Sequence, residues 1–244
     1  MEAQQIRFDS LPSQGKVYPE DIEIYIKPLT IKEQIDMDRF GITQAEYFRK
    51  VLEGVIIQGT FPKNQLLFHD VQFLDLVRRL YTFDIEDKII VKDYPCSEPF
   101  CGHKFDYSFT VDQIEFTDFS DDIFGKEFTF SDGLTVVVSP LTIEEFIEMS
   151  KKYMSNKVND TSNIVLGYYT YCIKEIKDRE FKDRKARDEF LVDYLGNLSM
   201  HKDVKILKQI EEETVSLMKP FETICPQCGS LVEVRISPSM NFHQ

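Results

Sequence analysis

The sequence predicts an α+β fold of two homologous units, each made of a β-hairpin, a capped helical bundle and a cysteine knuckle followed by a strand. Three observations support this prediction. A ten-residue segment occurs twice, amphipathic helices follow each copy, and each half ends in a pair of cysteines. The length of 244 residues fits one or two domains, because single hydrophobic cores stop growing at about 250–300 residues.

The repeated segment opens a helix in each half. Residues 28–37 read Pro-Leu-Thr-Ile-Lys-Glu-Gln-Ile-Asp-Met and residues 140–149 read Pro-Leu-Thr-Ile-Glu-Glu-Phe-Ile-Glu-Met, so seven of the ten positions are identical. Each copy has a threonine followed three residues later by a glutamate, the capping box that satisfies the free amides of a helix start. An alternating strand precedes each copy, at 22–26 and at 135–138. We therefore expect the elements to follow the same order in both halves.

Further helices are expected after each capped helix. Apolar stripes at helical spacing run over 48–56 and 73–81 in the first half, matched by 165–176 and 190–198 in the second. An additional helix at about 202–217 would lengthen the second half. Each half then closes with a cysteine pair, a glycine and an alternating strand.

The domain prediction follows from this order. We expect a first unit at 1–118, an acidic linker at 119–126 and a second unit at 127–244. The two units would have arisen by duplication of one unit of about 110 residues. Between the lysines at 104 and 126 there is no basic residue. This stretch is predicted to be a solvated linker, with a docking strip for a basic partner as the alternative. Its carboxylates are Asp106, Asp112, Glu115, Asp118, Asp121 and Asp122.

Two cysteine pairs form the candidate metal site. Cys225-Pro-Gln-Cys228-Gly has the spacing of a zinc knuckle, while Cys96 and Cys101 are more widely spaced. One pair supplies two ligands and a closed tetrahedral site needs four, so we predict that all four cysteines share one zinc ion across 123 intervening residues. His103 is an alternative ligand to one thiolate of the first pair. Reduced turn cysteines without metal are the competing interpretation.

No catalytic constellation is visible. Four protein ligands leave no open position for water, so the predicted zinc is structural. Gly-rich phosphate loops, Gly-x-Ser-x-Gly elbows and His-Glu-x-x-His motifs are absent from the sequence. Cys172 lies on an apolar helix stripe and is expected to be a small core residue. We therefore predict that the protein is not an enzyme.

The charge balance argues against nucleic acid as a partner. The formal net charge is −13, so the average surface repels phosphate, and the basic run at 182–187 is mixed with acidic residues. A zinc-ribbon adaptor that binds nucleic acid or the transcription machinery is therefore only an alternative. No apolar stretch approaches the roughly 20 residues that a transmembrane helix needs, and no export signal is recognisable, so we expect neither a membrane span nor secretion.

Several runs together resemble the T-even phage baseplate hub subunit family. They are Leu-Pro-Ser-Gln-Gly-Lys-Val-Tyr at 11–18, the opening of the capped helix at 26–34, Asp-Val-Gln-Phe-Leu-Asp-Leu-Val-Arg-Arg-Leu at 70–80, the first cysteine pair with its glycine, and Val-Asp-Gln-Ile at 111–114. The resemblance covers 11–116 and extends weakly over 127–236 through the internal repeat. This chain would differ from the family in having two such units instead of one.

The resemblance implies a non-enzymatic structural or assembly protein of the baseplate hub in a contractile-tail phage. It would act through contacts with other hub, spike or tape-measure proteins, in the host cytoplasm during assembly and in the tail baseplate of the virion. A tail assembly chaperone that is absent from the virion is the alternative within this class.

Overall fold

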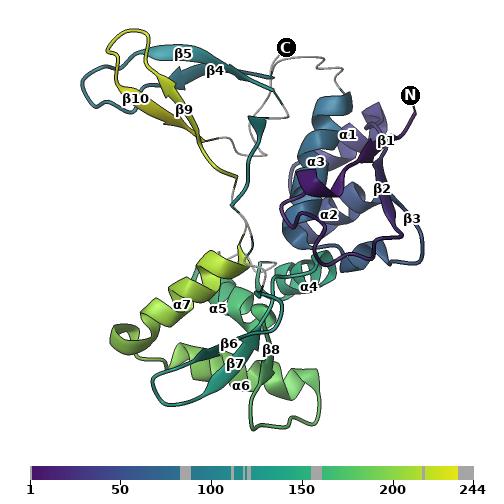
Figure 1. Ribbon diagram of the computed structural model, residues 1–244, viewed down its shortest axis with the longest axis vertical. Helices are drawn as coiled ribbons and strands as arrows, with labels where there is room; N and C mark the ends of the chain where they lie inside the picture. Colours follow the sequence, from purple (N-terminus) through teal and green to yellow (C-terminus); the bar gives the residue numbers. More distant parts are fainter. Residues whose placement is uncertain are drawn as a thin grey trace.

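The computed structural model describes residues 2–82, 89–110, 113–117, 119, 122–154, 161–215 and 218–235. Figure 1 shows two helical lobes, each with its own small sheet, and a separate ribbon of two β-hairpins. The first lobe contains β1 (Gln4–Ile6), η1 (Phe8–Ser10), β2 (Glu23–Ile26), α1 (Ile31–Met37), α2 (Gln44–Glu53), β3 (Val55–Gln58), η2 (Lys63–Gln65) and α3 (Phe68–Thr82).

The second lobe has the same order of strands and α-helices, with one additional α-helix, α6. Its sheet has the strand order β6-β7-β8 and the sheet of the first lobe has the order β1-β2-β3; both are antiparallel. In each lobe the first two strands form a hairpin and the third strand pairs with the second. The helix α6 lies between the third strand and the last helix, where the first lobe has only η2. The elements are β6 (Lys126–Thr129), β7 (Thr135–Val138), α4 (Ile143–Tyr153), α5 (Thr161–Cys172), β8 (Ile173–Ile176), α6 (Arg184–Gly196) and α7 (Met200–Thr214).

Both predicted capping boxes are present. The side chain of Thr30 accepts a hydrogen bond from the Glu33 N–H, and the Glu33 carboxylate accepts one from the Thr30 N–H; Thr142 and Glu145 do the same at the start of α4. A third capping box opens α2 at Thr43. These interactions span four residues, which is why the local sequence is sufficient to predict where the helices begin.

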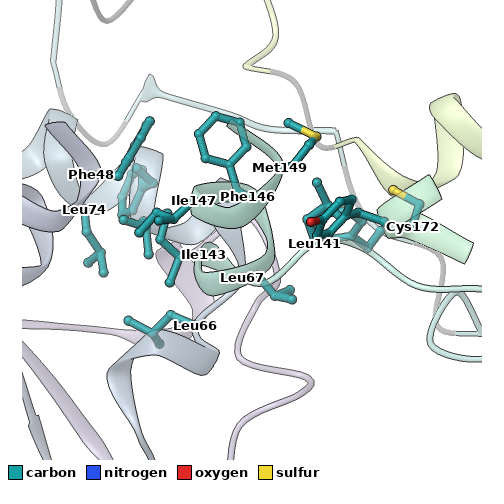
Figure 2. Packing of buried hydrophobic residues seen from close by; sticks show 14 of the residues in the cluster. Phe48, Leu66, Leu67, Leu74, Leu141, Ile143, Phe146, Ile147, Met149 and Cys172 are labelled. Carbon is teal, nitrogen blue, oxygen red and sulfur yellow. The ribbon is translucent and has the colours of Figure 1, made fainter. Parts of the chain in front are cut away.

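The two lobes share one hydrophobic core. Phe146 of α4 stacks on Phe68 at the start of α3, with ring centroids 3.8 Å apart and an interplanar angle of 10°, and meets Phe48 of α2 edge-on. Beside this contact, Leu67 and Thr142 form an antiparallel β-bridge. Figure 2 shows α4 between the lobes, with Ile143, Phe146 and Ile147 toward Phe48 and Leu74 and with Met149 on the other side. One core therefore crosses the expected boundary between the units.

The expected linker is tied into this core. Phe119 and Ile123 are buried in it, and the Gly125 N–H donates to the Val138 carbonyl. Two of the acidic side chains form ion pairs: Asp122 with Lys126 at 3.5 Å and Glu115 with Lys219 at 3.2 Å. Asp112, Asp118 and Asp121 lie outside the described residues. The apolar residues of the linker therefore anchor it, which the charge pattern alone did not predict.

A buried aspartate fixes the loop that connects the first two strands. Asp70 of α3 is fully buried and accepts hydrogen bonds from the Ser13 N–H at 2.9 Å, the Ser13 hydroxyl at 2.6 Å and the Tyr18 hydroxyl. The Tyr18 hydroxyl in turn accepts from the Leu67 N–H at 2.9 Å. Ser13 of the Leu-Pro-Ser-x-Gly run and the nearby Tyr18 therefore both donate to the buried Asp70 carboxylate. Tyr18 also accepts from Leu67, the residue that forms the β-bridge to the second lobe.

The second lobe has the same arrangement. Asp203 of α7 is buried and accepts from the Ser131 N–H at 2.8 Å and from the Ser131 hydroxyl at 3.1 Å. Ser131 lies in the turn between β6 and β7, as Ser13 lies between β1 and β2. In both lobes a serine of the first connection is therefore tied to an aspartate of the last helix.

Gly54 makes room for a buried arginine, and this gives a first prediction. Arg78 is buried and donates to the Lys27 carbonyl at 2.7 Å and to Glu33 at 2.8 Å, while a Cβ on Gly54 would lie 2.0 Å from its guanidinium carbon. We expect Gly54→Ala to lower the free energy of unfolding by about 1–3 kcal/mol, because the arginine must leave its partners. Urea denaturation measures this.

The matched control is Gly196→Ala, since nothing lies within 4 Å of the added methyl group at the end of α6. It should stay within about 0.5 kcal/mol of wild type. Equal stability of the two variants would contradict the steric role assigned to Gly54.

Candidate metal centre

The ribbon is built from one hairpin of each half of the chain. β4 (Ile89–Pro95) pairs with β5 (Lys104–Phe109), and β9 (Phe221–Ile224) pairs with β10 (Leu231–Val234). Figure 1 shows the two hairpins side by side, although one precedes the second lobe in the sequence and the other follows it. Strands were expected after each cysteine pair, and β5 and β10 lie there.

The two connecting loops have the same local geometry. The Cys96 N–H donates to the His103 carbonyl at 2.8 Å, and the Cys225 N–H donates to the Ser230 carbonyl at 2.9 Å, so each loop is closed next to its first cysteine. A glycine follows each second cysteine with a positive φ, +62° at Gly102 and +74° at Gly229. Glycine adopts this left-handed conformation without strain, which allows the chain to turn back and direct both thiols to one side.

The four cysteines meet at the ends of these hairpins. Their sulfur atoms all lie within 4.8 Å of one another. The two close pairs each join one cysteine from each half: Cys96 to Cys228 at 3.7 Å and Cys101 to Cys225 at 3.8 Å. Four thiolates at about 2.3 Å from a central zinc ion would be about 3.8 Å apart, so these separations fit a tetrahedral site. They are too long for a disulfide, whose sulfur atoms are about 2.05 Å apart.

The other candidate residues lie elsewhere. The cluster found among the described residues consists of the four cysteines and does not include His103, whose ring stacks on Phe105. Cys172 is fully buried in the shared core, as expected, and burial raises the pKa of its thiol to about 11. Cys172 is therefore a core residue and takes no part in the cluster.

The pKa values of two of these thiols shift in opposite directions. Hydrogen bonds from the Ser230 side chain and backbone lower the pKa of Cys228 to about 6. At Cys96, a backbone hydrogen bond from Glu98 favours the thiolate, but burial and the three neighbouring sulfurs outweigh it and raise the pKa to about 12. The Cys228 thiolate thus forms readily, whereas the Cys96 thiol resists ionisation. A divalent cation at the centre would remove this resistance, since metal binding deprotonates coordinating thiols.

A small second core holds the hairpins together. Phe109 of β5 lies against Phe221 of β9 with ring centroids 4.7 Å apart, and Val232 and Val234 of β10 are fully buried. The Tyr94 hydroxyl donates to the Glu233 carbonyl and accepts from the Arg235 N–H, both at 3.1 Å. Leu76 and Leu80 of α3 belong to the same cluster, which links the ribbon to the first lobe. The site therefore depends on packing from both halves.

The geometry of the four thiols is compatible with a bound zinc ion. All four members of the cluster are thiols, the ligand set of a closed structural zinc site. No helix among the described residues has the length and apolar character needed to cross a membrane. Fold and site together define an α+β protein of two helical lobes with a ribbon of two cysteine-bearing hairpins.

The comparison with protein families agrees with this class. Residues 3–242 match the family described as T4 bacteriophage base plate protein, and the chain belongs to that family. The match covers the second half as fully as the first and so extends well beyond the resemblance over 11–116. No curated protein and no solved structure matches the chain. Membership indicates a structural role in the phage baseplate, with other baseplate proteins as partners and the virion tail as location.

Proposed function

We propose that the protein is a non-enzymatic component of the baseplate hub in a contractile-tail phage. Its partners would be other hub proteins and the spike or tape-measure proteins, reached by protein–protein contacts. The observation that carries this proposal is the family match over 3–242. The proposal is supported by a cluster of four cysteines that could hold a structural metal ion and by a core that joins two lobes into one scaffold. Assembly would take place in the host cytoplasm.

The proposal includes one structural zinc ion per chain, held by Cys96, Cys101, Cys225 and Cys228. Each close sulfur pair joins the two halves, so the ion would tie the first hairpin to the second. A two-cysteine hairpin cannot complete a tetrahedral site alone. The ribbon would therefore form only after both halves of the chain have been made.

The proposal also includes duplication of one ancestral unit. It is supported by the common order of elements, by the repeated capping boxes and by the two serine–aspartate contacts. The Lys27 N–H donates to the Gly54 carbonyl after α2, and the Ser139 N–H donates to the Cys172 carbonyl after α5. Because Asp203 lies on α7, the counterpart of α3 would be α7, and α6 would be the added helix. This replaces the correspondence with 190–198 that the apolar stripes predict.

Two other functions make different predictions. A tail assembly chaperone would have the same partners but would be absent from finished particles. A zinc-ribbon adaptor would bind DNA or RNA with an affinity that falls steeply with salt. The net charge of −13 disfavours the adaptor, since it repels phosphate.

The function can be tested by disrupting the gene in its phage. We expect infected cells to accumulate filled heads without completed tails, as seen by electron microscopy, and expect a plasmid copy of the wild-type gene to restore infectious particles. Tailed, infectious particles made without this protein would refute an essential role in the baseplate.

A further inference from the structure

The close sulfur contacts of the cysteine cluster run between the two hairpins. Cys96 lies 3.7 Å from Cys228 and Cys101 lies 3.8 Å from Cys225, measured between the Sγ atoms. The partners in these contacts are 132 and 124 positions apart in the chain. A disulfide would require the two sulfurs of each pair to approach by about 1.7 Å more. Small rotations of the side chains are therefore enough to link the two halves of the protein covalently.

The two pairs differ in their access to solvent. Cys228 is exposed and its partner Cys96 is half-buried, whereas Cys225 is only 1% exposed. A small oxidant dissolved in water therefore reaches Cys228 first. The sulfur that is in contact with Cys228 belongs to the other hairpin.

Contacts that do not involve the sulfur atoms favour this arrangement of the hairpins. Phe109 of β5 lies against Phe221 of β9, and the Tyr94 hydroxyl of β4 bridges the Glu233 carbonyl and the Arg235 N–H. Loss of a metal ion lets the ribbon open, but these contacts form again each time that it closes. The same pairs of sulfurs are then brought back together.

A disulfide within one loop is the competing outcome. It would join Cys96 to Cys101, or Cys225 to Cys228, and would close only a few residues of chain. A bond between the hairpins closes a loop that contains the whole second lobe, and a longer loop removes more freedom from the unfolded chain. Links between the hairpins therefore stabilise the folded ribbon more than links within a loop.

We propose that the ribbon has a second way of closing, in which two disulfides, Cys96–Cys228 and Cys101–Cys225, replace the zinc ion as the tie between the halves. They form when metal-free protein meets a peroxide. The inference rests on the proposed function, which supplies both the zinc site and the place in the virion. Thiols stay reduced in a cytoplasm, whereas disulfides persist outside cells. The metal would thus tie the halves during assembly, and the disulfides would keep them tied in a released particle that has lost the metal.

Each disulfide consumes one molecule of hydrogen peroxide. The Cys228 sulfur attacks one peroxide oxygen and the O–O bond breaks, which gives a sulfenic acid and, with the thiol proton, one water. The Cys96 sulfur then attacks the Cys228 sulfur. The S–O bond breaks, and the hydroxyl group leaves with the Cys96 proton as a second water. Two thiols lose two electrons and the peroxide gains them. Cys101 and Cys225 react in the same way with a second molecule of peroxide.

Peptide mapping tests which hairpins are joined. Trypsin releases 93–104 with both cysteines of the first pair and 209–235 with both of the second, since Pro220 protects the bond after Lys219. We expect full-length protein, freed of metal by a chelator and treated with hydrogen peroxide, to yield the two peptides as one species in non-reducing mass spectrometry. A reductant should separate them, and zinc added before the peroxide should slow their linkage. Separate peptides with internal disulfides would overturn the proposal.

Paired substitutions test which sulfurs join. Cys101→Ser with Cys225→Ser keeps the contact between Cys96 and Cys228, which are 3.7 Å apart. Cys101→Ser with Cys228→Ser is the matched control, because it keeps one cysteine in each hairpin but takes them from different close pairs. We expect the first variant to form its disulfide at least tenfold faster than the control at the same peroxide concentration. Equal rates would refute the assigned pairing.

Amide hydrogen exchange tests whether the disulfides replace the metal. Removal of the metal should speed exchange in β9 and β10, and oxidation should slow it again at least tenfold. A ribbon that exchanges as fast after oxidation as before it would overturn the proposal. Failure of this inference can be told apart from failure of the proposed function: protein that is present in particles but forms no disulfides between the hairpins overturns the inference alone. Disulfides in a protein that is absent from particles overturn only the role in the hub.

Discussion

Replacing Cys228 with serine is expected to reduce bound zinc from about one ion per chain to a small fraction of that value. Serine leaves three thiolates, and a hydroxyl is a poor ligand for zinc at neutral pH. The binding free energy of a structural zinc is folding free energy, so the ribbon should also open. Zinc content by elemental mass spectrometry and amide hydrogen exchange of β4, β5, β9 and β10 measure the two effects.

The helical lobes should survive this change. Most of their buried residues belong to the shared core, and the small core of the ribbon includes Leu76 and Leu80 of α3, so loss of the metal removes few of the contacts that hold the lobes together. Cys172→Ala is the matched control: it removes a buried thiol from the shared core, should lower stability and should keep the zinc. Full zinc retention in Cys228→Ser would contradict the four-cysteine site.

The second large effect is expected at Asp70. Asp70→Ala leaves the Ser13 N–H, the Ser13 hydroxyl and the Tyr18 hydroxyl without their acceptor in a buried site. Each orphaned buried donor costs about 1–3 kcal/mol, so we expect the free energy of unfolding to fall by about 3–5 kcal/mol. Asp9→Ala is the control, because the Asp9 pair with Arg7 is exposed and should contribute less than about 1 kcal/mol. Equal effects of the two substitutions would contradict the role of Asp70.

The effect of Asp70→Ala should depend on pH. Burial raises the pKa of Asp70 to about 6, against the hydrogen bonds from Ser13 and Tyr18 that lower it. The unfolded chain has a pKa of about 3.9 for this group, so its titration contributes stability that is fully present below pH about 4 and is lost as pH rises through about 6. The difference in unfolding free energy between wild type and variant should therefore be larger at pH 4 than at pH 7. An opposite trend would refute the raised pKa.

Local signals account for what the sequence predicted well. The capping boxes at Thr30 and Thr142 depend on residues three positions apart, so the helix starts could be read directly. The cysteine pairs meet across the whole second lobe, and the spacing could predict this because a single pair cannot complete a tetrahedral site. A capping box lies within one short segment, whereas a cysteine pair shows by its incompleteness that it needs a second segment.

The environment of the repeated segment could not be predicted from its residues. Ile31 and Ile143 have the same local sequence but opposite exposures, because only α4 has a second lobe to contact. The role of Asp203 was missed for a different reason: apolar stripes favoured 190–198 as the counterpart of α3. The proposed duplication pairs α3 with α7 instead, and the sequence signal for that pairing is Asp-Val-x-apolar-Leu, present at 70–74 and at 203–207.

Quantitative mass spectrometry of purified particles from the source phage tests the proposed function most directly. The account predicts this protein at a small, fixed number of copies per particle, in constant ratio to the other tail proteins. Absence from particles together with abundance in infected cells would contradict a built-in hub component and would favour an assembly chaperone.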